Sequence, residues 1–240
     1  MATKVPKRIS PNPIVDSVVE LRFTNAVPSE AVFGMIFSQL SGEFPEFHNL
    51  PVAQLPAEIR EKDQNLRFSP THEARSGGYV FRVGAHVLSL ANTPEYFGWD
   101  NYSARLKTVL GAVAEAGVVR GFTRLGIRYI DFFELDIFDK VILSITKGGE
   151  PFEAEQKAFN ALVKNGKFNT NLRIANNKTM SVKAVQMTGS VIDTDTFLGL
   201  PDETGSAGLF DLIDECHQAA KDIFFSLLRD DFISTLNPEY

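Results

Sequence analysis

The segment Arg120–Leu135 constrains the fold more than any other part of the chain, because its residues alternate in character. Large apolar side chains share one side of an extended chain, namely Leu125, Ile127, Tyr129, Phe133 and Leu135. Arg124 and Arg128 fall on the opposite side. A period of two is what a strand with one packed face requires. The pattern therefore predicts a long central β-strand with a core face and a charged face.

Composition indicates a soluble, cytoplasmic globular protein. The chain has 240 residues with 44% hydrophobic residues, which is enough for a packed core, and a net charge of −6. That acidic balance argues against nonspecific nucleic-acid binding. Double-stranded DNA is not expected as a partner, because the arginines of the predicted strands would lie on a sheet and not on a helix. One cysteine excludes an intrachain disulfide, and no apolar run suits a secretory signal or a membrane span. We expect a flexible N-terminal arm over residues 1–12 and a single domain over residues 13–240.

The first half of that domain, residues 13–118, reads as strand, helix, hairpin and helix. A strand over 15–23 precedes a helix that opens at Ser29 and ends at Pro45. A short strand is expected at 57–60, and a hairpin between 66–68 and 79–90 around the Ser76–Gly78 turn. An aromatic loop over 93–100 leads into a helix that stops at Gly117.

The second half, residues 119–240, is expected to repeat this order. The strand at 122–135 is followed by helical stretches at 137–143 and 152–164, a hairpin of 168–175 with 181–194 turned at Asn176–Asn177, a loop over 199–205 and a C-terminal helix. The sequence thus predicts an α+β fold: an antiparallel sheet with helices packed on one face, in two pseudo-repeated strand-helix-hairpin-helix halves.

Several segments, in order, carry a resemblance that spans most of the chain. They are 13–23 (PIVDSVVELRF), 66–68 (LRF), 83–90 (VGAHVLSL), 96–102 (YFGWDNY) and 124–130 (RLGIRYI), with His217 and Phe224 on the terminal helix. With these segments the chain resembles a sporadically distributed prokaryotic family of uncharacterised proteins. The resemblance implies one fold over the whole length and an accessory or mobile-element role. It supplies no catalytic residue.

The sequence shows no recognisable catalytic, nucleotide-binding or metal-binding signature, and we expect neither a metal nor a cofactor. The four histidines, His48, His72, His86 and His217, lack ligand spacing. Cys216 falls on the apolar stripe of the last helix, which predicts a buried structural thiol. Asp193 and Asp195 share one face of a strand end; they could bind a cation or act as acid and base, although a solvated strand end is favoured.

Arginines recur in the predicted strands, and they are the set that most suggests a binding face. They are Arg22, Arg67, Arg82, Arg124, Arg128 and Arg173. If the strands are neighbours, several guanidinium groups converge on one sheet face, which suits an anionic ligand or an acidic partner. The alternative is pairing across strands with the acids Asp16, Glu20, Asp131 and Glu134.

The aromatic loop before the second helix offers a second candidate surface. It holds Tyr96, Phe97, Trp99 and Tyr102. Exposed, these rings could anchor a partner or stack a base. Buried, they cap the end of the core, and burial is favoured.

The leading hypothesis is a non-enzymatic cytoplasmic protein that recognises a protein partner, as an antitoxin, immunity or adaptor-like component would. The open sheet face or edge and the aromatic loop would make the contact, and homo-oligomerisation is plausible. The candidate binding residues are Arg22, Arg82, Arg124, Arg128, Tyr96 and Trp99. The alternative is a binder of, or enzyme acting on, a small anionic ligand held by the strand arginines. A deep pocket with unpaired arginines favours the ligand, and a flat apolar surface favours a protein partner.

Overall fold

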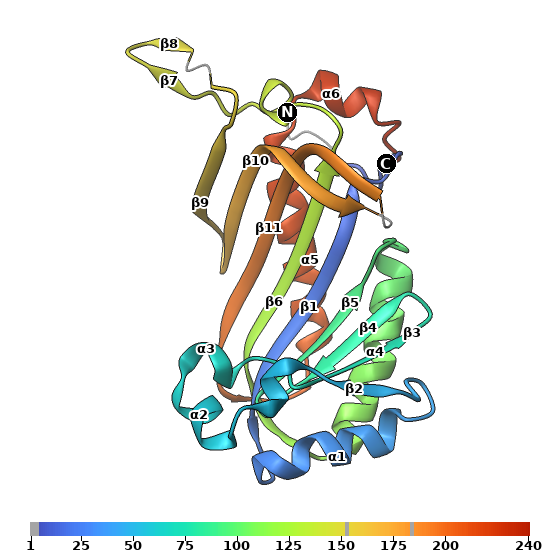
Figure 1. The fold of residues 1–240 in the computed structure, drawn as a ribbon. Coiled ribbons are helices and arrows are strands. Elements are labelled where there is room, and N and C mark those ends of the chain that lie inside the picture. The colour runs from blue at the N-terminus through green and yellow to red at the C-terminus, as the bar shows by residue number, and fades with distance from the viewer. Residues whose placement is uncertain (1–4, 152–153, 183–184) are drawn as a thin grey trace.

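The computed structural model describes residues 5–151, 154–182 and 185–240. Within them, one large antiparallel sheet runs through the molecule in the order β2-β3-β4-β5-β1-β6-β11-β10-β9 (Figure 1). Its nine strands are β1 (Ile14–Asn25), β2 (Phe47–Asn49), β3 (His72–Ser76), β4 (Tyr79–Val83), β5 (Val87–Asn92), β6 (Val119–Phe133), β9 (Ala158–Asn165), β10 (Phe168–Val182) and β11 (Val185–Thr204). A separate small hairpin is formed by β7 (Thr146–Lys147) and β8 (Glu150–Pro151).

Helices cover one face of this sheet, which gives the predicted α+β fold. The two long helices α4 (Trp99–Glu115) and α5 (Leu209–Leu227) lie behind the sheet in Figure 1, and α1 (Ser29–Leu40) contacts α4. Shorter helical segments complete the fold: η1 (Pro51–Gln54), α2 (Ala57–Lys62), α3 (Gln64–Arg67), η2 (Ile137–Asp139) and α6 (Asp230–Thr235).

Strand β6 is the central strand that its alternating residues predict. It pairs with β1 on one side and β11 on the other. Leu125 and Ile127 are fully buried on the helix-covered face, opposite Leu21 and Val19 of β1. Arg124 and Arg128 face the other way, onto what we call the open face of the sheet. The period of two therefore sets which residues enter the core.

The buried side chains form two separate clusters on the helix-covered face. The larger one lies under α1, α4 and the first turns of α5, and it includes Ile127 and Tyr129. The smaller one gathers around the end of α5, α6 and η2, and it includes Phe133 and Phe224. Strand β6 runs from one cluster to the other, so the residues between Tyr129 and Phe133 lie at the seam between two apolar cores.

The predicted elements between α1 and β4 are partly wrong. Residues 57–60 and 66–68, expected as strands, lie in or next to helices α2 and α3. The Asp63 carboxylate accepts the backbone N–H groups of Asn65 and Leu66, and this cap opens α3. Arg67 therefore ends a helix and does not belong to the sheet. Residues 79–90, expected as one strand, form most of β4 and β5, and β4 pairs with β3 on one side and β5 on the other. The turn at Gly77 and Gly78 has positive φ angles of 56° and 80°.

The predicted helices after β6 are also wrong where the structure describes them. The stretch 137–143 holds only the single turn η2, and residues 158–165 form the edge strand β9. Residues 152 and 153 lie outside the described residues. The strand-helix-hairpin-helix order thus holds in the first half alone, because no α-helix of the described chain separates β6 from β9.

The second hairpin is longer than its sequence suggests. Asn176 and Asn177 were expected as the turn, but β10 continues to Val182 and pairs with β11 along that length. The positive φ of 49° at Asn177 fits a β-bulge between Ala175 and Lys178 as well as it would fit a turn. Strand β11 also continues to Thr204, through most of the expected loop over 199–205.

The N-terminal segment lies against the C-terminal end of the chain. The Lys7 N–H donates to the Glu239 carbonyl, and the Ser10 N–H donates to the Leu236 carbonyl. Ile9 is buried in the smaller core cluster. Residues 5–12, expected as part of a flexible arm, are thereby placed next to α5 and help to close the cavity described below.

Candidate ligand-binding site

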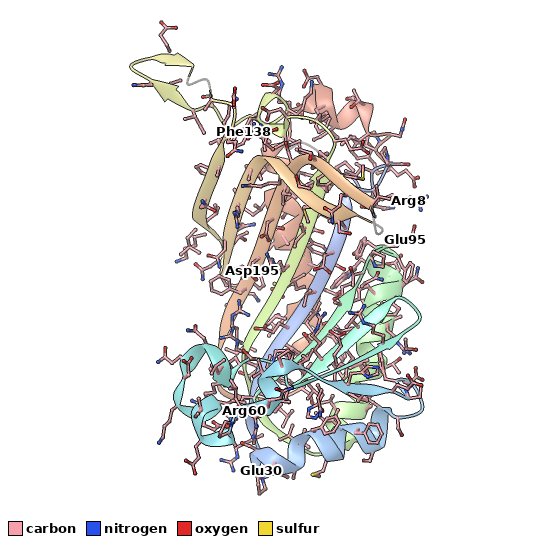
Figure 2. All side chains as sticks on the ribbon, viewed as in Figure 1. Arg8, Glu30, Arg60, Glu95, Phe138 and Asp195 are labelled. Carbon is pink, nitrogen blue, oxygen red and sulfur yellow. The ribbon has the colours of Figure 1, made fainter. Side chains whose placement is uncertain are left out.

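A partly enclosed cavity of about 340 Å³ lies on the helix-covered face, between the two apolar cores. Its walls come from the N-terminal segment, the aromatic loop before α4, strands β6 and β11, and α5. Figure 2 labels Arg8, which lines the cavity, and Glu95, which precedes the lining residue Tyr96 in the chain. We call this cavity the aromatic pocket after its principal lining residues Tyr96, Phe97, Trp99, Tyr129, Phe224 and Phe225.

The carboxyl group of Asp131 is the most unusual group in the aromatic pocket. Asp131 follows Tyr129 by two positions on β6, so its side chain lies on the packed face, where it is only 3% exposed. Within the described residues, Asp131 makes no hydrogen bond and no ion pair. Burial raises the pKa of this carboxyl well above its ordinary value, and the charge of Asp193 raises it further. Burial of an isolated acid favours its protonated form.

Beside Asp131, three side chains form a connected array along the pocket wall. The Tyr129 hydroxyl is 2.8 Å from His217 Nδ1, and the His217 ring stacks on the Trp99 indole with 4.0 Å between centroids. Trp99 Nε1 in turn donates to the Asp214 carboxylate at 2.9 Å. Burial, with a further contribution from Lys221, lowers the pKa of His217 to about 3. The imidazole is therefore neutral at physiological pH, and the array fixes its position.

Two further hydroxyl groups of the aromatic pocket are buried without a hydrogen bond among the described residues. Thr194 lies opposite Tyr129 on β11, and its Oγ1 has no partner there. The Tyr96 hydroxyl lies near that of Tyr129, but the two do not reach hydrogen-bond geometry. Buried polar atoms without partners are uncommon in folded proteins, and a ligand or an ordered water is the usual explanation.

The chemistry available in the aromatic pocket follows from these groups. Aromatic rings provide apolar walls, and the unpartnered oxygen atoms can accept hydrogen bonds from a bound molecule. A carboxyl whose pKa is raised by burial can also hold a proton. The aromatic pocket is thus equipped first for binding.

The predicted arginines share the open face, on the other side of the sheet. Arg22 and Arg124 lie directly opposite each other on β1 and β6. Both donate to Glu20 Oε1, at 3.0 and 2.9 Å, so one carboxylate bridges two guanidinium groups. Arg124 Nη2 also lies 3.6 Å from the carboxylate of Asp195, a residue labelled in Figure 2.

The remaining two predicted arginines are paired in the same way. Arg128 donates two hydrogen bonds to the Asp193 carboxylate, at 2.8 and 2.7 Å, and Arg82 donates to Glu73 at 2.7 Å. Pairing with acids, the alternative interpretation of this set, therefore describes the open face, with Glu20 as one of the expected acids. Arg82, Arg124 and Arg128 pair across strands, whereas Arg22 pairs with Glu20 within β1. Asp131 does not take part, because it lies on the opposite face. Asp193 and Asp195, expected as a solvated strand end, serve as partners of arginines.

The aromatic loop divides its residues between the core and the aromatic pocket. Tyr102 is fully buried, and its hydroxyl accepts the Val19 N–H and donates to the Leu90 carbonyl. Tyr96 and Trp99 are half-buried and line the aromatic pocket, so the structure brings these two predicted residues together. It does not bring them together with the four predicted arginines.

The sequence analysis missed Asp131, Tyr129, Thr194 and His217 as pocket residues. Asp131 could have been found, because it has the same parity as the apolar residues Leu125, Ile127, Tyr129 and Phe133 of the strand. A charged residue in such a position is a signal of function. His217 and Thr194 carry no such local signal. Cys216, the neighbour of His217, is fully buried as predicted, and burial raises its thiol pKa to about 12.

The fold and the aromatic pocket together define an α+β protein with a partly enclosed, largely aromatic cavity. No family model and no curated protein matches the chain. None of the helices in the described residues combines the length and the apolar composition needed to cross a membrane. The resemblance to a sporadically distributed prokaryotic family stays a prediction.

Proposed function

We propose that this protein binds a small organic molecule in the aromatic pocket. The observation that carries the proposal is the buried carboxyl of Asp131, which has no partner among the described residues and lines the cavity. Leaving a polar group buried without a hydrogen bond costs free energy. A bound molecule that pairs with Asp131 would remove this cost, which explains why an acid can occupy a packed sheet face.

The size and lining of the aromatic pocket support this proposal. A volume of about 340 Å³ falls within the range of small-molecule sites, which is roughly 300–1,000 Å³. Such sites combine apolar walls with a few polar groups that fix orientation. The open face gives less support to the anionic-ligand hypothesis, because each of its four candidate arginines already pairs with a carboxylate.

The single tryptophan of the chain makes the proposal testable. Trp99 lines the aromatic pocket, and it is the only indole in the protein. We expect a ligand from a panel of small polar aromatic compounds to change its fluorescence and to raise the melting temperature, since a ligand that binds only the folded state stabilises it.

A matched pair of variants locates the binding. Ala220→Leu adds volume inside the aromatic pocket, because Ala220 is buried there, whereas Gln218→Leu adds the same side chain on the exposed side of α5. Ala220→Leu should abolish both responses and Gln218→Leu should retain them. Unchanged affinity in Ala220→Leu would place the ligand elsewhere and contradict the proposal.

Recognition of a protein partner, the hypothesis favoured by the sequence, is supported by the edge strand β9. Within the described residues, β9 pairs with β10 alone, so the backbone along its other side is available to a further strand. Leu162 on this edge is 65% exposed, and Lys164 is the only charged residue of β9. Charged side chains on an edge strand usually prevent another strand from pairing with it, and β9 has only one.

Light scattering of purified protein tests this second candidate. A partner or second copy that adds a strand to β9 should be lost in Leu162→Lys, because a charge on the edge opposes strand addition. Thr179→Lys, on an exposed part of β10 away from this edge, is the control. A complex that withstands Leu162→Lys would exclude the edge as its contact.

A further inference from the structure

Three oxygen-bearing groups of the aromatic pocket make no hydrogen bond among the described residues. Oγ1 of Thr194 and the hydroxyl of Tyr96 are buried without a partner. The carboxyl of Asp131 is buried as well, and all three residues line the same cavity. Hydroxyl and ionised carboxyl oxygens accept hydrogen bonds. The interior of the aromatic pocket is therefore best matched by a ligand group that donates several hydrogen bonds.

No cation of the described chain neutralises Asp131. The charge that acts on it is that of another acid, Asp193 on the neighbouring strand. The basic residues that line the cavity, Lys7, Arg8 and Lys221, belong to the N-terminal segment and α5. Arg8 pairs with Glu239, and neither lysine forms an ion pair with Asp131 among the described residues. An ionised Asp131 would thus need its positive partner from outside the chain.

The aromatic walls favour a positive charge as well. Tyr96 meets Tyr129 edge to face at 5.8 Å between centroids, and Trp99 stacks on His217 nearby. The faces of such rings carry negative electrostatic potential and attract ammonium groups, most strongly where water is excluded. His217 is neutral, so the positive charges among the lining residues are those of Lys7, Arg8 and Lys221. The carboxyl of Asp131 and the hydroxyls of Thr194 and Tyr96 can therefore all accept hydrogen bonds from one ligand group.

We infer that the ligand of the aromatic pocket carries a protonated primary amine, which forms an ion pair with Asp131, on an apolar or aromatic body. The inference rests on the proposed small-molecule function and specifies the ligand class. The three N–H groups of a primary ammonium equal in number the three unpartnered groups, Asp131, Thr194 and Tyr96. The body of the ligand lies against the aromatic walls.

Binding of an amine should release a proton. Burial raises the pKa of Asp131 and so favours its protonated form, whereas an ammonium beside it favours the ionised form. The proton passes from the carboxyl to the solvent buffer, while the ammonium keeps its own. Calorimetric binding enthalpies should therefore depend on the ionisation enthalpy of the buffer, with protons released to it.

Three probes of one shape test the inference: 2-phenylethylamine, its neutral counterpart 2-phenylethanol, and the anion phenylacetate. Titrations are followed by Trp99 fluorescence and calorimetry. We expect the amine to bind wild-type protein roughly tenfold to a hundredfold more tightly than the alcohol, the size of one charged hydrogen bond, and phenylacetate to bind weakest. Asp131→Asn should abolish the preference for the amine. Asp193→Asn, a matched change of the neighbouring acid on the open face, should keep it.

The outcomes separate this inference from the proposed function. An alcohol that binds as tightly as the amine, or an amine preference that persists in Asp131→Asn, overturns the ligand class and leaves the aromatic pocket as a binding site. A neutral or anionic ligand from the panel of small polar aromatic compounds, whose binding Ala220→Leu abolishes, would also overturn the ligand class and leave the aromatic pocket as a binding site. If no compound of either panel binds, both the inference and the proposed function are overturned.

Discussion

Replacing Asp131 by asparagine should change how the stability of the protein depends on pH. Below its ordinary pKa of ~3.9, the carboxyl is protonated in both the folded and the unfolded chain, and it adds no pH dependence. Above that value the unfolded chain releases the proton, whereas the folded chain retains it because burial raises the pKa of Asp131. The folded state then binds more protons, so the free energy of unfolding falls as pH rises.

The size of the effect follows from linkage. Between the ordinary pKa and the raised one, the free energy of unfolding falls by ~1.4 kcal/mol for each pH unit. For a chain of this size that corresponds to about 3–6 °C in melting temperature per pH unit. The amide that Asp131→Asn introduces does not titrate. The free energy of unfolding of the wild type minus that of this variant should therefore fall with this slope from about pH 4 upward. A constant offset is also expected, since a buried amide without partners costs ~1–3 kcal/mol.

Chemical denaturation of both proteins at closely spaced pH values measures the slope. His217 acts in the opposite direction, because its pKa is lowered to about 3: its effect stabilises the fold as pH rises from there to its ordinary 6.5. This contribution is common to both proteins and cancels in the difference. Thr194→Val, a change in the same aromatic pocket without a titrating group, is the control and should give a difference without slope. Parallel curves for wild type and Asp131→Asn would refute the reasoning.

Four further changes test the fold and its charged face. Ile127→Ala, at a fully buried position of β6, should lower the free energy of unfolding by ~2–5 kcal/mol in urea titrations; a change near zero would contradict its core position. Gly189→Ala places a Cβ against the Phe133 carbonyl oxygen, where β11 pairs with β6, so it should lower the melting temperature. An unchanged melting temperature would contradict this close approach. The Cys216 thiol, with a pKa of about 12, should resist a disulfide reagent in the native protein and react after denaturation; fast native reaction would contradict its burial. Arg128→Ala removes a half-exposed ion pair and should cost at most ~1 kcal/mol in the same urea titrations; a larger loss would show that the pair is structural.

The fold class and the central strand could be predicted from the sequence, because they depend on a strong local pattern. Alternation along β6 fixes its packed and open faces before any neighbour is known. The same pattern marks Asp131, since parity places it between Tyr129 and Phe133 in the core. Asp131 was expected to pair with arginines because it lies on the same strand as Arg124 and Arg128. Its odd position places its side chain on the other face of that strand.

The errors fall where local signals compete or where long-range pairing decides. Residues 158–165 resemble a short helix in composition, yet pairing with β10 makes them a strand. Asn176 and Asn177 suit a turn, and the sheet uses them at a bulge. The aromatic pocket depends on the register that places Thr194 opposite Tyr129 and on the position of α5, which brings in His217. Neither can be derived from spacing along one chain.

The two faces of the sheet differ in what they can contribute to binding. On the open face, a ligand anion would have to displace carboxylates such as Asp193 from their arginines, and the exchange of one anion for another gains little. On the packed face, Asp131 has no partner among the described residues to lose, so a donor that reaches it gains a charged hydrogen bond in a site shielded from water. The charged face that the sequence suggested as a binding surface is therefore already paired within the chain, and Asp131, an acid on an apolar face, marks the place where a ligand gains most.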